Sequence, residues 1–529
     1  MSQDRTASTE NEQDHIARAA SIIALGNIAS RVLGLVREQL IAYLFGATGL
    51  VSAFGIANKV PKMIYELLVG GMLSAALVPV FSQVAEQKGR PALWALFSRI
   101  LSLIATVLAV LVLLLEILAP QVAWLLGGGF SPELQMALAQ MLRLITPAMF
   151  FFGLSGVITG LLYTLKRFTY PAFGAAVFNL GIIIAAPLLA GRFDAYSLAI
   201  GVLLGSLFQL LILIPDLRGV RFRFQLNLSD PSLRRILVLY LPIALGLVVS
   251  NIQVAIDQRL ASSTGESSIA WMDRATTLVQ LPHGMVAVAI SLAVLPSLSR
   301  LSAAGNQEGF RRTLGLGLRL VLVLIVPATL GLAVLAEPVV ALLFEHGKFT
   351  AYDTYWTAWA LRLYLVGLVF ASIDWPLNYA FYAQQDTLSP ALVGILSVGV
   401  YIVVALSLIQ PLGMLGLVLA DSAKHLSHAM TMLVLTWRRT GRLSDLRLGQ
   451  TTVKVLIAAS AMAGLIVLTM AATDRLVHTE GLLGDAVAVI VPAGVGALAY
   501  LGLVSLFRIE EVDLLWGLLR KRLQRSNLD

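Results

Sequence analysis

The sequence predicts an all-α polytopic membrane protein, and three observations support this fold class. Of the 529 residues, 58% are apolar and only 13% are charged, whereas soluble domains carry about 25% charged residues. The apolar residues gather into fourteen runs, each near or above the ~20 residues that a membrane-spanning helix needs. The positive charges lie mainly in alternate loops between these runs. A chain of soluble domains is therefore excluded.

The fourteen runs are bounded by glycine, proline or charged residues. They occupy residues 20–46, 50–85, 93–126, 135–163, 170–190, 195–214, 232–263, 270–303, 312–343, 354–383, 388–410, 412–437, 452–472 and 482–507. Membrane barrel strands alternate apolar and polar residues over about ten positions, and these runs do not. Because lipid offers the backbone no hydrogen-bonding partner, we expect every run to be helical.

The loop charges predict the orientation. With the N-terminus in the cytoplasm, the cytoplasmic loops and tails hold 23 Lys and Arg residues and the opposite loops hold three, Arg192, Lys348 and Arg475. This asymmetry predicts that both termini are cytoplasmic, and it accounts for most of the net charge of +8 without a nucleic-acid partner. The loop after the tenth run, residues 384–386, has no positive charge, so its side follows from its neighbours alone.

The chain resembles itself at an offset of 217–219 residues. Residues 78–82 (VPVFS) match 295–299 (LPSLS), and residues 142–144 (LRL) match 361–363 (LRL). The matches map runs two to five onto runs eight to eleven. They predict two copies of one six-helix unit, arranged as a parallel repeat about an axis along the membrane normal. Two similar bundles that face each other across a cleft are a transporter architecture.

The repeat and the loops predict a linear organisation of six segments. These are a cytoplasmic tail (1–19), a first six-helix lobe (20–214), a cytoplasmic linker (215–231), a second six-helix lobe (232–438), two added C-terminal helices (439–507) and a cytoplasmic C-terminal tail (508–529).

Several basic residues lie inside the predicted spans, where charge is expensive and usually functional. The candidates for binding are Arg31, Arg37, Lys59, Lys62 and Arg274. They predict a cationic cavity for an anionic substrate. The alternatives are snorkelling to the membrane surface and internal pairing, for example of Arg37 with Glu38 or of Lys62 with Glu66.

Other ionisable residues leave alternatives open. Asp257 could bind a cation or a proton, or pair with a neighbour. Asp273 could pair with Arg274 or cap a helix. A polar cluster in the twelfth run contains Asp421, Lys424, His425 and His428. We interpret this cluster as a polar helix face rather than a metal site, because no strong third ligand is placed and a lysine repels cations.

The sequence lacks the residues and motifs that several kinds of chemistry require. The chain has no cysteine, so disulfides, thiol nucleophiles and cysteine metal sites are excluded. It contains no phosphate-binding loop of the type used in ATP-driven transport, and no Ser/His/Asp constellation is evident. We expect a transporter without a cofactor rather than an enzyme.

Four motifs resemble the MurJ/MviN lipid II flippases of the multidrug/oligosaccharidyl-lipid/polysaccharide exporter superfamily. They are residues 30–38 (SRVLGLVRE), Lys59-Val60-Pro61, the stretch from Asp273-Arg274 to Leu281-Pro282-His283-Gly284, and Gly347-Lys348-Phe349-Thr350. The resemblance covers nearly the whole chain. It implies a V-shaped fold in which two six-helix lobes surround a central cationic cavity and the last two helices form a groove for a lipid tail.

The resemblance also implies a function. Lipid II, the undecaprenyl-diphosphate-linked peptidoglycan precursor, would move from the inner to the outer leaflet of the bacterial inner membrane by alternating access. Membrane potential, protons or sodium would drive the movement. Expected partners are lipid II, membrane lipids and, as candidates, cell-wall synthesis enzymes.

The family resemblance assigns roles to individual residues. Arg31, Arg37 and Arg274 match its essential cavity arginines, Glu38 matches their acidic neighbour, and Lys59 matches a basic position. The expected substrate-binding set is completed by Lys62, and the expected supporting or gating residues are Asp273, Ser52 and Glu66.

The sequence departs from the family pattern at several positions. An acidic cavity residue of many members is Ser52 here, a basic residue is Tyr65, and an acidic residue is Gly70. Asp257 matches a sodium ligand of some members, but the positions of its partners hold Tyr401 and Ala405, which disfavours sodium coupling. The alternative functions are export of another polyprenyl-linked glycan or of an amphipathic drug, and a non-transporting scaffold for cell-wall synthesis.

Overall fold

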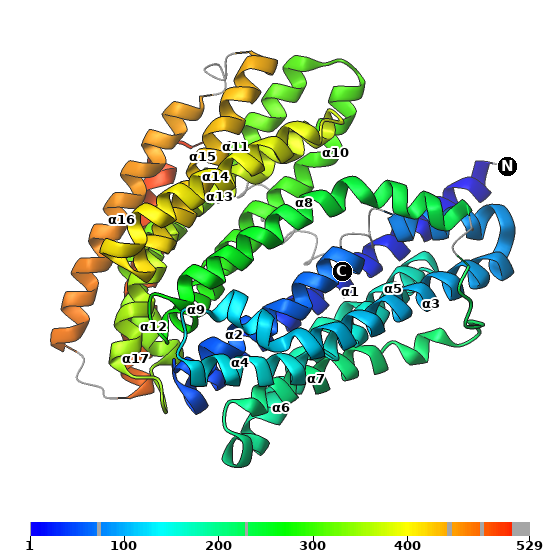
Figure 1. Cartoon of the computed structure of the whole chain (residues 1–529). Coiled ribbons are helices and arrows are strands. Elements are labelled where there is room, and N and C mark those ends of the chain that lie inside the picture. The colour runs from blue at the N-terminus through cyan, green and yellow to red at the C-terminus, as the bar shows by residue number, and fades with distance from the viewer. Residues whose placement is uncertain are drawn as a thin grey trace. The chain divides into compact units, whose positions relative to one another are not determined.

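A computed structural model describes residues 2–70, 76–227, 231–441, 447–476, 481–509 and 511, and each of its elements within these ranges is a helix (Figure 1). Ten helices among the described residues are long and apolar enough to cross a membrane. The all-α, multi-span fold class is therefore confirmed, while the count of fourteen spans stays a prediction. The chain divides into two compact units, Met1–Ala270 and Trp271–Asp529.

Among the described residues, the first unit begins with a long α-helix and continues through seven more α-helices, one π-helix and one 3₁₀ helix. Its elements are α1 (Ser2–Phe45), α2 (Gly49–Tyr65), the π-helix η1 (Glu66–Gly70), α3 (Val78–Gly127), α4 (Pro132–Ile145), α5 (Ala148–Thr164), α6 (Thr169–Phe193), α7 (Tyr196–Leu211), the 3₁₀ helix η3 (Ile214–Leu217) and α8 (Pro231–Ser262). Gly89, at φ +76°, kinks α3 between the second and third predicted runs.

The second unit contains most of α9 (Ser268–Pro282) and everything that follows. Its other elements are the π-helix η4 (His283–Val288), α10 (Ala289–Ala303), α11 (Gln307–Val334), α12 (Ala336–Phe344), α13 (Ala351–Ala383), α14 (Leu388–Leu412), α15 (Met414–Thr440), α16 (Leu448–Leu476) and α17 (Leu482–Leu506). The two C-terminal helices pack on each other, and they also pack on α11 and α12 (Figure 1).

The bounds of the elements repeat at the offset found in the sequence. Helices α6 and α14 are both 25 residues long, and α14 begins and ends 219 positions after α6. Lys166 and Gln385, which precede these two helices at the same offset, both have positive φ. The π-helices η1 and η4 begin at residues 66 and 283, an offset of 217. The two copies therefore share irregular backbone as well as regular helix.

The boundary between the two units differs from the predicted boundary between the two lobes. Helix α8, which the repeat assigns to the second copy, packs on α3 and η1 within the first unit. Helix α1 includes residues 2–19, which the sequence analysis assigns to a tail. The predicted C-terminal tail lies almost wholly outside the described residues, as does Arg442 in the loop after α15. The six-plus-six lobe division stays a prediction.

Small residues allow α6 and α7 to pack closely side by side (Figure 1). A Cβ added at Gly181 would lie 2.2 Å from the Cα of Gly205, and one added at Gly205 would lie 2.4 Å from the carbonyl oxygen of Phe178. Both distances are shorter than any van der Waals contact, so the two backbones must separate to admit a side chain. This contact holds α6 in the position from which it meets α1 and α2.

We predict that Gly205→Ala destabilises the protein by about 1–3 kcal/mol, because overpacking a close helix contact strains the backbone. Gly191→Ala is the matched control, since no atom lies within 4 Å of a Cβ added there and alanine favours helix by about 1 kcal/mol. Thermal unfolding in detergent measures the stability of both variants against that of the wild type. Equal transition temperatures for the two variants would contradict the proposed contact.

Candidate functional site

Arg37, near the C-terminal end of α1, is held by two partners. Arg37 contacts Glu38 at 2.5 Å and donates from Nη1 to the Asn179 Oδ1 of α6 at 2.8 Å. Asn179 in turn donates to the backbone carbonyl of Ser30 at 3.1 Å. Glu38 and Asn179 are buried. The pairing of Arg37 with Glu38 that the sequence suggested is present, and its amide partner fixes the guanidinium against α6.

The preceding residue of α6 meets a second basic side chain. The Lys62 Nζ of α2 lies 5.7 Å from the centre of the Phe178 ring. Phe178 packs on Phe152 at 5.2 Å, and Phe152 packs on Tyr65 at 6.0 Å between ring centres. Because Phe178 and Asn179 are consecutive, α6 brings Lys62 and Arg37 to the same turn. An ammonium over an aromatic face is stabilised by the ring quadrupole.

The third basic side chain joins α2 to α8. Lys59 donates to the Gln258 Oε1 at 3.2 Å, and the Gln258 Nε2 donates to the Asp257 carboxylate at 3.3 Å. Gln258 is buried. The two residues that the sequence analysis treated separately, Lys59 and Asp257, therefore belong to one hydrogen-bonded chain. A single amide orients both charges.

Ser52 and Glu66 have structural surroundings of their own. The fully buried Ser52 accepts a hydrogen bond from the backbone amide of Ala270 at 3.2 Å, which satisfies a donor in the first turn of α9 that has no partner within its own helix. Glu66 is exposed and begins η1. The Tyr240 hydroxyl donates to the carbonyl of Leu67 within that π-helix.

The remaining expected residues lie apart from these contacts. Arg31 is exposed on α1. Arg274 lies in the second unit and is 4% exposed. The backbone carbonyl of its neighbour Asp273 accepts hydrogen bonds from the hydroxyls of Thr276 and Thr277. The structure thus brings Arg37, Glu38, Lys59, Lys62 and Asp257 into contacts among α1, α2, α6 and α8, and it buries Arg274 separately.

Three residues of the site escaped the sequence analysis. Asn179 and Phe178 hold Arg37 and Lys62, and Gln258 holds Lys59. Asn179 could have been predicted from the sequence, because it is a polar amide inside an otherwise apolar run. Phe178 gave no signal, since an aromatic residue in a membrane span is ordinary.

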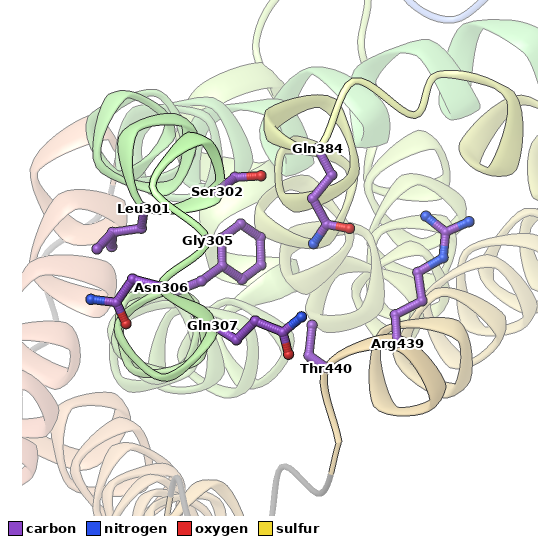
Figure 2. Close-up of a pocket in the computed structure, with 9 residues that line it drawn as sticks. Leu301, Ser302, Gly305, Asn306, Gln307, Gln384, Arg439 and Thr440 are labelled. Carbon is purple, nitrogen blue, oxygen red and sulfur yellow. The ribbon is translucent and has the colours of Figure 1, made fainter.

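A cavity of about 190 Å³ lies at one end of the second unit (Figure 2). It is lined by the α10–α11 turn, by Gln384 and by the end of α15 with Arg439 and Thr440. Three of the loops that the sequence analysis predicts to be cytoplasmic therefore meet at one end of the second unit, including the uncharged loop after the tenth run. The cavity lining contains none of the expected binding residues.

The loop carboxylate beside this cavity is held ionised. Asp386 accepts hydrogen bonds from the backbone amide and the hydroxyl of Ser389 and lies 2.5 Å from Arg439. These contacts lower the pKa of Asp386 to about 2, the backbone hydrogen bond from Ser389 contributing most. Arg439 also stacks 4.7 Å over the Phe381 ring. The loop is thus fixed to α15, and its arginine is neutralised locally.

Long apolar helices with basic and acidic side chains held inside them define an all-α, multi-span membrane protein. A solved MATE-family multidrug transporter of the MOP superfamily, in an inward-facing conformation, shares this fold with a TM-score of 0.68 at 15% identity, covering 79% of this chain and 96% of its own. The family model for the lipid II flippase MurJ matches residues 41–491. The chain belongs to the MurJ family.

Individual relatives agree with this assignment. The lipid II flippase MurJ of Burkholderia cenocepacia is 31% identical over 403 residues, which cover 74% of this chain and 78% of the relative. A probable lipid II flippase MurJ of Bdellovibrio bacteriovorus is 27% identical over 95% of this chain and 97% of its own. A solved structure of MurJ in an inward closed conformation has a TM-score of 0.78 at 25% identity, covering 92% of this chain and 98% of that one.

We predict an energetic coupling between Arg37 and Asn179 in a double-mutant cycle of Arg37→Met and Asn179→Leu. Contacting residues couple by about 0.5–3 kcal/mol, because removal of either partner leaves the other buried without its hydrogen bond. Unfolding in detergent measures the cycle. Arg37→Met combined with Thr164→Val is the control, since the Thr164 hydroxyl donates to Gly160 within α5. Additive losses in the Arg37/Asn179 cycle would show that the contact contributes nothing.

Proposed function

We propose that this protein flips lipid II from the cytoplasmic to the outer leaflet of the bacterial inner membrane. The observation that carries the proposal is the family match over residues 41–491, and basic side chains inside the spans support it. The cargo has an apolar polyprenyl tail and a charged diphosphate headgroup. A protein that moves it must present cations at membrane depth, where few proteins tolerate them.

In this proposal the basic residues of the first unit bind the diphosphate headgroup. Arg37, Lys59 and Lys62 are each held in place by a neighbour, so little ordering remains when an anion binds. Arginine matches a phosphate with two parallel hydrogen bonds, and the low dielectric of a protein interior strengthens the attraction. Glu38 keeps Arg37 compensated when no cargo is bound. Arg31, which is exposed, is free to meet the headgroup first.

The second unit contributes Arg274 in this proposal. Arg274 is buried on the span formed by α9, η4 and α10. A cargo contacted by basic residues of both units during the cycle would favour one arrangement of the units over another, which is the thermodynamic requirement for coupling binding to movement. We further propose fourteen spans in two six-helix lobes, a V-shaped cationic cavity, cytoplasmic termini, and α16–α17 as the groove for the lipid tail.

The proposal predicts that Arg31→Gln, Arg37→Gln and Arg274→Gln each lower lipid II flipping at least tenfold, because each removes a charge that the diphosphate would contact. Vesicles containing the purified protein and lipid II give the rate, and complementation of a flippase-depleted bacterium gives the cellular readout. Arg192→Gln is the matched control, since Arg192 lies at the end of α6 against Phe193.

The outcomes separate the alternatives. Wild-type protein that flips no lipid II would overturn the proposed function. Transport of cationic drugs by the same vesicles, with no lipid II flipping, would favour an exporter instead. Normal rates for all three arginine variants would remove the proposed site while leaving the function intact. Protein amounts in the membrane must match that of the wild type for any of these readings.

A further inference from the structure

A half-buried polar cluster lies in the second unit. It is formed by α13, α15 and η4, and its members are Ser372, Asp374, Trp375, Asn378, Asp421, Lys424, His425, His428 and His283. Helices α13 and α15 approach closely here, because a Cβ at Gly367 would lie 2.8 Å from the Cα of Ser422. Ionisable groups at this depth are costly unless they have a function.

The centre of the cluster is a carboxylate–imidazole pair. The Nδ1 of His428 lies 2.7 Å from Oδ1 of Asp374, and the Asn378 Nδ2 donates to Oδ2 at 2.9 Å. Each side chain of the pair is 15% exposed. The Asn378 donor holds Asp374 as an acceptor through Oδ2, and the short distance between Oδ1 and the His428 Nδ1 requires one proton between these two atoms.

The adjoining histidine is neutral. The indole Nε1 of Trp375 donates to the Nε2 of His283 at 2.9 Å. An indole nitrogen can only donate, so this ring nitrogen of His283 has no proton. Its Nδ1 lies 3.3 Å from the Ser372 hydroxyl. Asp374 and Trp375 are neighbours on α13, so the helix joins the His428 pair to the π-helix η4.

The charges of the cluster balance around a single proton. Asp421 lies 2.5 Å from Lys424 and 3.6 Å from His425, so one acid is compensated by the lysine. Asp374 is compensated only while His428 is protonated. Loss of that proton leaves a net negative charge, and a second proton leaves a net positive one. Each change alters the net charge of a cluster whose charged side chains are only 15–34% exposed, so water screens that charge incompletely.

Other ionisable groups nearby do not alter this balance. Tyr379 and Tyr382 follow Asp374 on α13, and Tyr401 is buried on α14. Arg319 of α11 pairs with Glu511, and Arg362 of α13 pairs with Glu337 of α12.

The internal repeat shows that the fold does not require the cluster. At the offset of 219, the first copy has Gly153, Ser155 and Gly156 where the second has Ser372, Asp374 and Trp375. At the offset of 218, it has Leu203 and Leu210 where the second has Asp421 and His428. Helices α5 and α7 nevertheless pack against each other, as α13 and α15 do. The same scaffold therefore assembles without ionisable side chains at these positions.

We propose that this cluster is a proton-binding site centred on Asp374 and His428, and that its proton is bound and released during the transport cycle. In the releasing step the His428 imidazolium loses its Nε2 proton to water, and the neutral ring keeps its Nδ1 proton in the contact with the Asp374 carboxylate. The link to cargo is the span that contains both Arg274 and His283, nine residues or roughly 13 Å apart along a helix. This coupling rests on the proposed lipid II function, whereas proton binding does not.

The first test needs no cargo. Tryptophan emission of the purified protein is titrated with pH for wild type, Trp375→Phe, Asp374→Asn and His428→Gln. We expect a pH-dependent step that Trp375→Phe removes and that both other variants shift by one pH unit or more. Asp386→Asn and His346→Gln, which alter an acid and a histidine outside the cluster, should leave it unchanged. A wild-type titration without this step would overturn the site.

The second test uses vesicles that contain lipid II. A pH gradient should change the wild-type flipping rate severalfold, while Asp374→Asn and His428→Gln should flip without responding to it. A rate that follows a sodium gradient instead, or a pH response retained in both variants, would overturn the coupling. If wild type flips no lipid II while the titration step is present, the proposed function fails and the proton site stands.

Discussion

An ionised side chain that leaves water loses several kcal/mol of hydration unless a partner replaces it, and this constraint organises both units. In the first unit Glu38 and Asn179 hold Arg37, Gln258 holds Lys59, and the Phe178 ring lies beneath Lys62. In the second unit Asp374 holds His428. Apart from Glu38, the partners come from other helices, so the charges also fix how those helices pack.

The two copies of the repeat use one scaffold for different chemistry. Equivalent helices begin and end at equivalent positions, yet the first copy concentrates cations along α1 and α2, and the second concentrates histidines and carboxylates along α13 and α15. A transporter needs one site that recognises cargo and another that takes up energy. A duplicated fold can place the two in separate halves without changing its backbone.

The π-helices mark where each copy departs from regular helix. Both begin at an ionisable residue, Glu66 in η1 and His283 in η4. A π turn widens the helix and leaves carbonyls without their usual partners, and in η1 the Tyr240 hydroxyl supplies one. In η4 the ring of His283 is held by Trp375. Irregular backbone and hydrogen-bonded polar side chains therefore occur together in both π-helices.

The sequence by itself determined the helical membrane class, the repeat and the list of intramembrane charges, because hydropathy and loop charge act along the chain. Only the tertiary structure decided the partners, because contacts such as Arg37 with Asn179 or Lys59 with Gln258 join residues 142 and 199 positions apart. The twelfth-run cluster shows the difference most clearly. From the sequence, Asp421, Lys424, His425 and His428 are interpreted as a polar face, but Asp374 and His283 join it only because α13 packs against both α15 and η4.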